Sequence, residues 1–334
     1  MDNTTNTLAG FEASYSAYLD DYNKQGDKFL KAETAGQKNA ALDDLSYIRD
    51  GDRLLGKKML ELALDRTENK NLRLKAISKL GNYAAGDTVA IGRLIRLMTA
   101  IKEYIELRRA ALDLLLGISF SSVALNARMP QFREGLRRLL ADKDPELVQK
   151  AIKKLAAYND AMAEQLLAGG LEDHSKALIS DAGAIQLLGG YQTNNHNVLI
   201  RSFLERSKDP AVQVEAIRAL SADEGSHGLI QGYLDNKQAD KHVRLMSLSA
   251  LNAAVPEKFL ASAQAIISDE NDYSDVKIAA LNTIALEPKY HELVLKDKGF
   301  NASVSSLLNN DNQALRLESA NYLQISEKQG NTEG

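Results

Sequence analysis

The side chains most able to carry chemistry in this sequence are five histidines and many carboxylates, with no cysteine among its 334 residues. No histidine stands three or four residues from another, so the chain has no helical pair of metal ligands; they are His174, His196, His227, His242 and His291. The one His-Glu dipeptide is His291-Glu292. Without cysteine, disulfides, thiolate metal sites and a cysteine nucleophile are excluded. We interpret the histidines as isolated residues at the surface or at hairpin ends.

Motifs for phosphate, dinucleotide and acyl chemistry are also missing from the sequence. It contains no P-loop, no dinucleotide glycine fingerprint and no nucleophile elbow. The glycine doublets Gly169-Gly170 and Gly189-Gly190 fall where helices should end, and glycine is the usual residue there. We therefore expect a protein that is not an enzyme and that needs no cofactor and no metal.

The charge of the chain is unevenly distributed. The formal net charge is -4, but residues 91–158 carry 13 basic and 7 acidic groups, whereas residues 159–334 carry 15 basic and 24 acidic groups. A basic middle followed by an acidic C-terminal half favours an acidic partner at the middle of the chain.

An internal repeat must position all of these side chains. Its frame is an apolar anchor, a small residue at the fifth position and apolar residues at the sixth and ninth, as in Leu72, Ala76, Ile77 and Leu80. The anchors stand at positions 37, 72, 107, 147, 179, 212, 243, 276 and 315, at spacings of 31 to 40 residues. The first of these copies is the weakest, because its anchor is Gln37.

Each frame places its four residues on one face of a helix. The small residue lets a neighbouring helix approach closely. A second amphipathic stretch precedes most frames, and Asp-Pro turns such as Asp144-Pro145 and Asp209-Pro210 join the two. The sequence thus predicts an all-α fold, an α-α superhelix of about nine helical hairpins, with more than about 60 % helix and no sheet.

The runs Asp144–Ile152 and Asp209–Ile217 resemble HEAT repeats. They are similar to the short bacterial type that is grouped with the phycobilisome-lyase HEAT-like repeats. The resemblance covers roughly residues 34–325 and implies that the second helices line the concave surface of an armadillo-like solenoid. It implies little about activity, because one repeat fold serves many functions.

The ends of the chain differ from the repeats. Residues 1–33 hold a polar tail and a stripe of Leu8, Phe11, Tyr15, Tyr18 and Tyr22, which we interpret as a helix that caps the array at 34–325. The alternative is a dimerising coiled coil or a stalk. Residues 1–7 and 326–334 are polar, and we expect both tails to lack regular structure. The long spacings at 117–130 and 288–300 predict insertions on one edge of the array.

Basic residues supply two candidate binding features. One follows the frame anchors, at Lys38, Arg73, Arg108, Arg244, Lys277 and Arg316, and is either an internal ladder or a phosphate-binding track. The other is a groove of side chains that face away from the hairpin core: Arg133, Arg137, Arg138, Lys150, Lys153, Lys154, Lys75, Lys79 and Arg218. The competing interpretation of the second set is a solvated helix face.

The function we predict is a protein-binding scaffold or adaptor whose concave surface takes another protein by protein–protein interaction. An acidic segment is the partner we expect. The alternatives are a nucleic-acid-binding protein similar to the HEAT-like DNA glycosylases, which the acidic C-terminal half disfavours, and last a lyase of the phycobilisome type. We expect a monomer without a membrane span, located in the cytoplasm by default because no signal peptide is visible. An exported protein that has lost its leader would show the same N-terminus.

Overall fold

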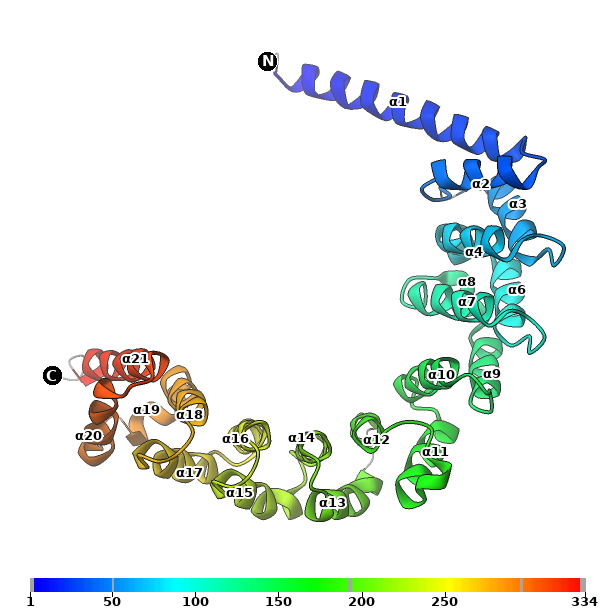
Figure 1. Ribbon diagram of the computed structural model, residues 1–334. Coiled ribbons are helices and arrows are strands. Elements are labelled where there is room, and N and C mark those ends of the chain that lie inside the picture. The colour runs from blue at the N-terminus through cyan, green and yellow to red at the C-terminus, as the bar shows by residue number, and fades with distance from the viewer. Residues whose placement is uncertain (1–2, 50, 192–193, 295–296, 331–334) are drawn as a thin grey trace. The chain divides into compact units, whose positions relative to one another are not determined.

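The computed structural model describes residues 3–49, 51–191, 194–294 and 297–330, and every regular element in these ranges is a helix (Figure 1). The helical fraction is 77 %, with no strand among the described residues, as the period of the repeat predicts. None of the described helices is both long and apolar enough to cross a membrane. By its internal contacts the chain divides into two compact units, Met1–Leu155 and Ala156–Gly334.

The first unit consists of paired helices joined by short turns. Its helices are α1 (Asn3–Leu30), α2 (Ala35–Asp44), α3 (Arg53–Leu64), α4 (Lys70–Lys79), α5 (Gly81–Gly86), α6 (Thr88–Met98), α7 (Ile105–Gly117), α8 (Val123–Ala127), α9 (Met129–Leu139) and α10 (Pro145–Ala157). The last of them crosses the boundary between the units. The hairpins are α1–α2, α3–α4, α6–α7 and α9–α10, and the short helices α5 and α8 connect them.

The second unit continues the same pattern. Its helices are α11 (Ala161–Glu172), α12 (Asp181–Leu188), α13 (Asn197–Arg206), α14 (Pro210–Ala219), α15 (His227–Asp235), α16 (Lys241–Ala254), α17 (Pro256–Ser268), α18 (Ser274–Leu286), α19 (Pro288–Val294), α20 (Lys298–Ser306) and α21 (Gln313–Gly330). Single 3-10 turns are η1 (His174–Lys176), η2 (Asn194–His196), η3 (Glu224–Ser226) and η4 (Leu307–Asn309). Five hairpins, α11–α12, α13–α14, α15–α16, α17–α18 and α20–α21, bring the number in the described chain to nine.

Within each unit the hairpins stack with second helices against second helices (Figure 1). In the first unit α4 packs on α2 and α7, and in the second unit α14 packs on α12 and α16. The small residues of the frame lie where these helices meet, and their exposure is 0 % at Ala76, Ala111, Ala151, Ala216 and Ala280. Each unit is therefore an α-α solenoid of HEAT-like hairpins, which confirms the fold predicted from the frame.

The Asp-Pro turns start second helices as expected. The carboxylate of Asp209 accepts a hydrogen bond from the Ala211 N–H at 2.9 Å, and Pro210 occupies the start of α14. Asp144 accepts from the Leu147 N–H at 3.0 Å at the start of α10. A capped amide and a proline without an N–H together satisfy the first turn of the helix, so the second helix begins at these residues.

The register of one repeat differs from the sequence interpretation. In α12 the frame begins at Ser180 rather than at Ile179, because the buried residues are Ala184, Ile185 and Leu188. Ser180 is the N-cap of this helix, and its Oγ accepts from the Gly183 N–H at 3.3 Å. The sequence carries apolar residues in both registers here, so the pattern alone selected the wrong one.

The two ends of the array also depart from the expectation. Helix α1 begins at Asn3 and α21 extends to Gly330, so the parts of the polar tails that the structure describes are helical. In α21 the frame residue Ala320 is exposed, whereas Leu315, Ser319 and Tyr322 are buried. No further hairpin packs against this side of α21 in the described chain. Ala320, at the frame position that would contact such a hairpin, is therefore exposed.

Helix α1 packs on the array through its C-terminal half. Tyr22 and Phe29 are each 6 % exposed. The Tyr22 hydroxyl donates to Asp52 at 3.0 Å and accepts from the Arg49 N–H at 3.0 Å. Further toward the N-terminus Tyr18 is 40 % exposed, and the side chains of Leu8 and Phe11 lie outside the described part. These contacts fit a capping helix, and the dimerising alternative stays a prediction.

Candidate protein-binding surfaces

A ladder of buried ion pairs links successive hairpins. Arg73 is 1 % exposed, and its Nε donates to the Ala63 carbonyl of the same hairpin at 3.0 Å. Its guanidinium donates to both carboxylate oxygens of Glu103, in the turn of the following hairpin, at 2.7 and 3.1 Å. Hydrogen bonding by Arg73 holds the pKa of Glu103 below its ordinary value. Arg108 and Arg244 make the same two kinds of contact, with the carbonyls of Met98 and Leu234 and with the carboxylates of Asp142 and Asp272.

The remaining basic residues after frame anchors also act inside the array. Lys38 pairs with Glu68 of the next turn, and Arg316 donates to the Asn310 carbonyl at 2.7 Å. Lys277 is 1 % exposed, and its burial lowers the pKa of its ammonium group. The internal-ladder interpretation is therefore confirmed, and these cations are engaged within the array rather than forming a phosphate-binding track.

Two of the predicted groove residues, Lys75 and Lys79, tie α4 to the preceding hairpin. Lys75 Nζ donates to Asn39 at 2.8 Å and pairs with the carboxylate of Asp43 on α2. Lys79 Nζ donates to the Ser46 carbonyl at 3.4 Å. Both side chains are half-buried. Both ammonium groups therefore bind polar groups of the preceding hairpin.

The α10 lysines repeat this arrangement one step further along. Lys150 Nζ pairs with Asp113 of α7 at 2.5 Å and with Glu146 at 2.7 Å. Burial alone would lower the pKa of Lys150, but the hydrogen bonds to the two carboxylates outweigh it and raise the pKa. Lys154 donates to the Ser119 hydroxyl at 2.8 Å, and burial lowers its pKa. Lys153 is exposed.

The arginines of the predicted basic groove lie on other helices than its α10 lysines. Arg138 on α9 is exposed, pairs with Glu134 at 3.2 Å, and lines open space next to Thr99, on the first-helix side. Arg133 and Arg137 are half-buried on the same helix. Arg218 belongs to the second unit and pairs with Glu215. The α9 arginines therefore lie on a first helix, whereas Lys150 and Lys154 lie on the second helix α10.

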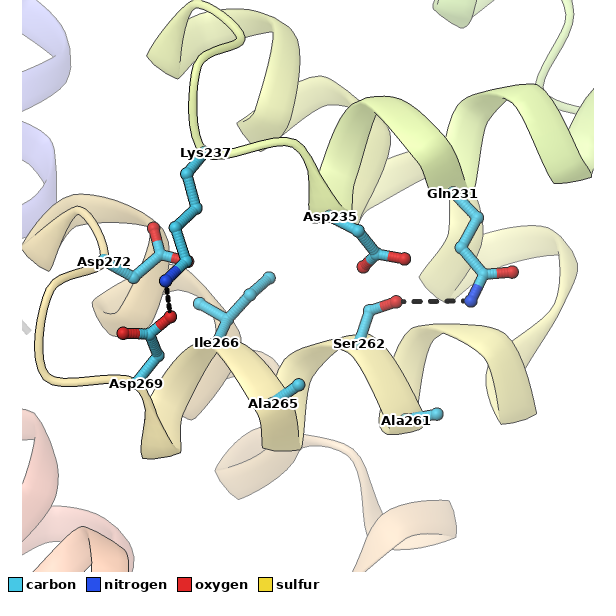
Figure 2. A pocket seen from close by; sticks show the side chains of 9 residues that line it. All are labelled: Gln231, Asp235, Lys237, Ala261, Ser262, Ala265, Ile266, Asp269 and Asp272. Atoms are coloured by element: carbon cyan, nitrogen blue, oxygen red, sulfur yellow. Dashed lines mark hydrogen bonds and ion pairs between the residues drawn. The ribbon is translucent and has the colours of Figure 1, made fainter.

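Open grooves lie instead between successive hairpin turns. The largest of three, about 690 Å³, separates the α6–α7 turn from the α9–α10 turn, and its apolar wall is Ile101, Ile105, Leu139 and Ala141. A groove of about 310 Å³ follows the α1–α2 turn in the same unit. In the second unit a groove of about 270 Å³ lies between α15 and α17, where Gln231 faces Ser262 and Lys237 pairs with Asp269 (Figure 2). Sequence reasoning missed these grooves because the turn residues that form them lie outside the frame.

The segment at 117–130 exposes large apolar side chains, as an insertion at the edge of an array can. Phe120 is 92 % exposed and Val123, at the start of α8, is 78 % exposed. The Lys154 ammonium lies 4.6 Å from the centre of the Phe120 ring. A cation above an aromatic ring orients that ring, so Phe120 is held outward at the edge of the second helices.

His196 and His227 each have a ring nitrogen next to an oxygen atom of another residue. His196 Nε2 lies 2.7 Å from Glu164, and His227 Nε2 lies 3.0 Å from the Ser221 carbonyl. The side chains of His291 and Glu292 lie outside the described part. Among the side chains that are described, no three histidine, aspartate or glutamate residues are placed to hold a metal ion.

No family model and no curated protein matches the sequence. Solved structures with a similar arrangement of helices include an engineered protein, with 19 % identity over 92 % of this chain and 88 % of that chain and a TM-score of 0.45. The complex of CpcE and CpcF of phycocyanin lyase from Nostoc sp. is 20 % identical over 84 % of this chain and 96 % of that chain, with a TM-score of 0.37. Human deoxyhypusine hydroxylase in complex with glycerol is 12 % identical over 75 % of this chain and 99 % of that chain, with a TM-score of 0.32.

Because these TM-scores are all below 0.5, the fold is assigned from two features of the chain itself. They are the pairing of its helices and the ladder of buried ion pairs. The helix pairing recurs from hairpin to hairpin in each unit, and buried ladder pairs form at Arg73, Arg108 and Arg244. Each unit of this protein is a HEAT-like helical repeat array.

Proposed function

We propose that this chain is a scaffold that binds another protein through the first unit and does not itself catalyse a reaction. The observation that supports the proposal is the exposed apolar pair Phe120 and Val123 beside the second helices. Aromatic side chains are enriched at the centres of protein interfaces, where they contribute much of the binding energy. Full burial of such a side chain is worth about 1.5–3 kcal/mol, which a partner that covers Phe120 would gain.

The Phe120 ring has a cation on one side and is otherwise open to a partner. Lys154 donates to Ser119 and lies against the ring, which is 92 % exposed. The exposed Lys153 adds a positive charge on the same helix. A partner with an apolar contact residue and an acidic neighbour would match this edge.

The test is capture of partners from an extract of the source cells by three immobilised forms of the chain. They are the wild type, the variant F120S/V123S, and a control V198S/L286S that removes two comparably exposed apolar residues of the second unit. Quantitative mass spectrometry should find one protein whose capture falls at least tenfold with F120S/V123S and stays unchanged with the control.

Equal capture by all three forms would contradict the proposal, and so would a wild type that retains no protein above the resin background. A nuclease treatment of the extract separates the alternative function. If capture of every partner is lost after that treatment, the chain binds nucleic acid instead.

A further inference from the structure

The groove between the α6–α7 and α9–α10 turns combines features that the other turn grooves lack. Its wall is apolar, and Ile101 at its edge is 84 % exposed. Its volume of about 690 Å³ lies within the range of pockets that enclose ligands. Tyr104, 56 % exposed, extends the apolar surface along the same turn. An exposed isoleucine next to a groove is a surface that a partner's apolar side chain would cover.

The carboxylates at the floor of this groove are neutralised by the array. Arg108 pairs with Asp142, and Arg109 Nε donates to Asp144 at 3.1 Å. Burial alone would raise the pKa of Asp142, but the hydrogen bonds from Arg108 and from the Asp144 N–H outweigh it and lower the pKa. The hydrogen bond from Arg109 lowers the pKa of Asp144 as well. Both groups stay ionised and paired, so they do not repel an incoming anion.

The rim of the groove also carries exposed cations. Lys102 follows Ile101 and Lys143 lines the groove, and both are exposed with no acidic partner among the described residues. Arg138, on the opposite wall from Ile101, has one exposed partner, Glu134. The residues that line the groove include three basic ones, Arg108, Arg138 and Lys143, and two acidic ones, Asp142 and Asp144. The groove thus presents net positive charge around an apolar wall.

The other two turn grooves are lined by more acidic than basic residues. The groove after the α1–α2 turn is lined by Glu61, Asp65 and Glu68, with two lysines. The groove of the second unit is lined by Asp235, Asp269 and Asp272, with one lysine (Figure 2). Ile101 lies in the first of the two turns that flank its groove, six residues before the anchor Leu107, and the same position in the first turns of the other two grooves holds Lys31 and Lys237. The apolar and basic character therefore belongs to one turn and does not follow from the repeat.

We infer that this groove binds an extended acidic segment of a partner protein, in which one or two large aliphatic residues are flanked by glutamates or aspartates. The aliphatic residue contacts Ile101, Ile105 and Ala141. The flanking carboxylates pair with Lys102 and Lys143. This inference deepens the proposed function, but it concerns a different surface from Phe120, so each can fail alone.

The test uses purified chain and a fluorescein-labelled decapeptide that contains two leucines between two pairs of glutamates. Fluorescence anisotropy should show saturable binding that weakens at least tenfold when the leucines become serines, and at least tenfold when the glutamates become glutamines. Raising the salt from 50 to 500 mM should also weaken it, because the rim charges are exposed.

Variants of the chain locate the site. I101S/K143E should weaken peptide binding at least tenfold, whereas L54S/K57E, which changes an exposed leucine and an exposed lysine on α3, should leave it unchanged. Unchanged circular dichroism of both variants confirms that they fold. The inference is wrong if the peptide does not bind at 1 mM, if the serine peptide binds as well as the leucine peptide, or if both variants behave alike. Retained capture of a partner through Phe120 would then leave the proposed function standing.

Discussion

Removing the guanidinium of Arg244 should strongly destabilise the second unit. Arg244 is 0 % exposed, and the carboxylate with which it pairs, Asp272, is 3 % exposed. Its Nε donates to the Leu234 carbonyl at 2.8 Å, and its Nη2 donates to Asp272 at 2.7 Å. R244M fills a similar volume with an apolar side chain and removes the hydrogen bonds that both partners accept from Arg244. One substitution therefore breaks a contact within a hairpin and a contact between two hairpins.

The expected loss of stability follows from the carboxylate charge that R244M leaves without its partner. Breaking a buried ion pair on one side costs about 3–5 kcal/mol, chiefly because the remaining charge is uncompensated. In this case Asp272 keeps one hydrogen bond, from the Tyr273 N–H at 2.6 Å, which favours the lower part of that range. The double variant R244M/D272N removes the stranded charge and should recover part of the loss, because the cost of breaking a buried pair comes chiefly from the uncompensated charge.

Urea denaturation followed by circular dichroism measures both effects as free energies of unfolding. R218M is the control, because Arg218 is exposed and its pair with Glu215 should contribute little. The reasoning is refuted if R244M loses less than about 1 kcal/mol, or if R244M/D272N is as unstable as R244M.

Three further outcomes are expected. A151L and A216L place a larger side chain at positions of 0 % exposure and should each cost about 1–3 kcal/mol in urea denaturation; unchanged midpoints at both would contradict the assigned register. The pKa of Glu103 is lower in the fold than its ordinary value of 4.5, so its stabilising effect is complete above that pH and is lost as pH falls through the depressed pKa. Melting temperatures at pH 7 and pH 3 should therefore differ less for E103Q than for the wild type. Deleting residues 1–31 should lower stability and leave a monomer in light scattering, since Tyr22 and Phe29 are buried against the array; a dimer that forms only with this segment present would support the coiled coil.

The fold was predictable because the same frame, which specifies a contact between neighbouring helices, occurs nine times in the sequence. An apolar anchor and a small residue four positions later, such as Leu147 and Ala151, fix which helices meet, and this pattern needs no long-range information. The register failed at Ile179 because a polar N-cap, Ser180, occupies the anchor position there. The hydrophobic pattern alone does not show whether a serine caps the helix at the anchor position or lies before the helix.

The binding surfaces were far less predictable. Lys75 and Lys150 were assigned to a groove because they point away from their own hairpin core, yet each points at a carboxylate of the preceding hairpin. The spacing within one repeat does not reveal that contact, because it depends on how neighbouring hairpins stack. The groove at Ile101 depends in the same way on the distance between two turns. Only Phe120 could be suspected from the sequence, as a large apolar residue in an insertion.

Site-specific photocrosslinking tests most directly whether the first unit binds another protein. Benzoylphenylalanine replaces Phe120 in one form of the chain and Val198, which is exposed in the second unit, in a control form. Both forms are expressed in the source cells and irradiated. A protein-binding edge at Phe120 predicts a discrete crosslinked protein with the first form and none with the control. No product at position 120, or the same products at both positions, would contradict it.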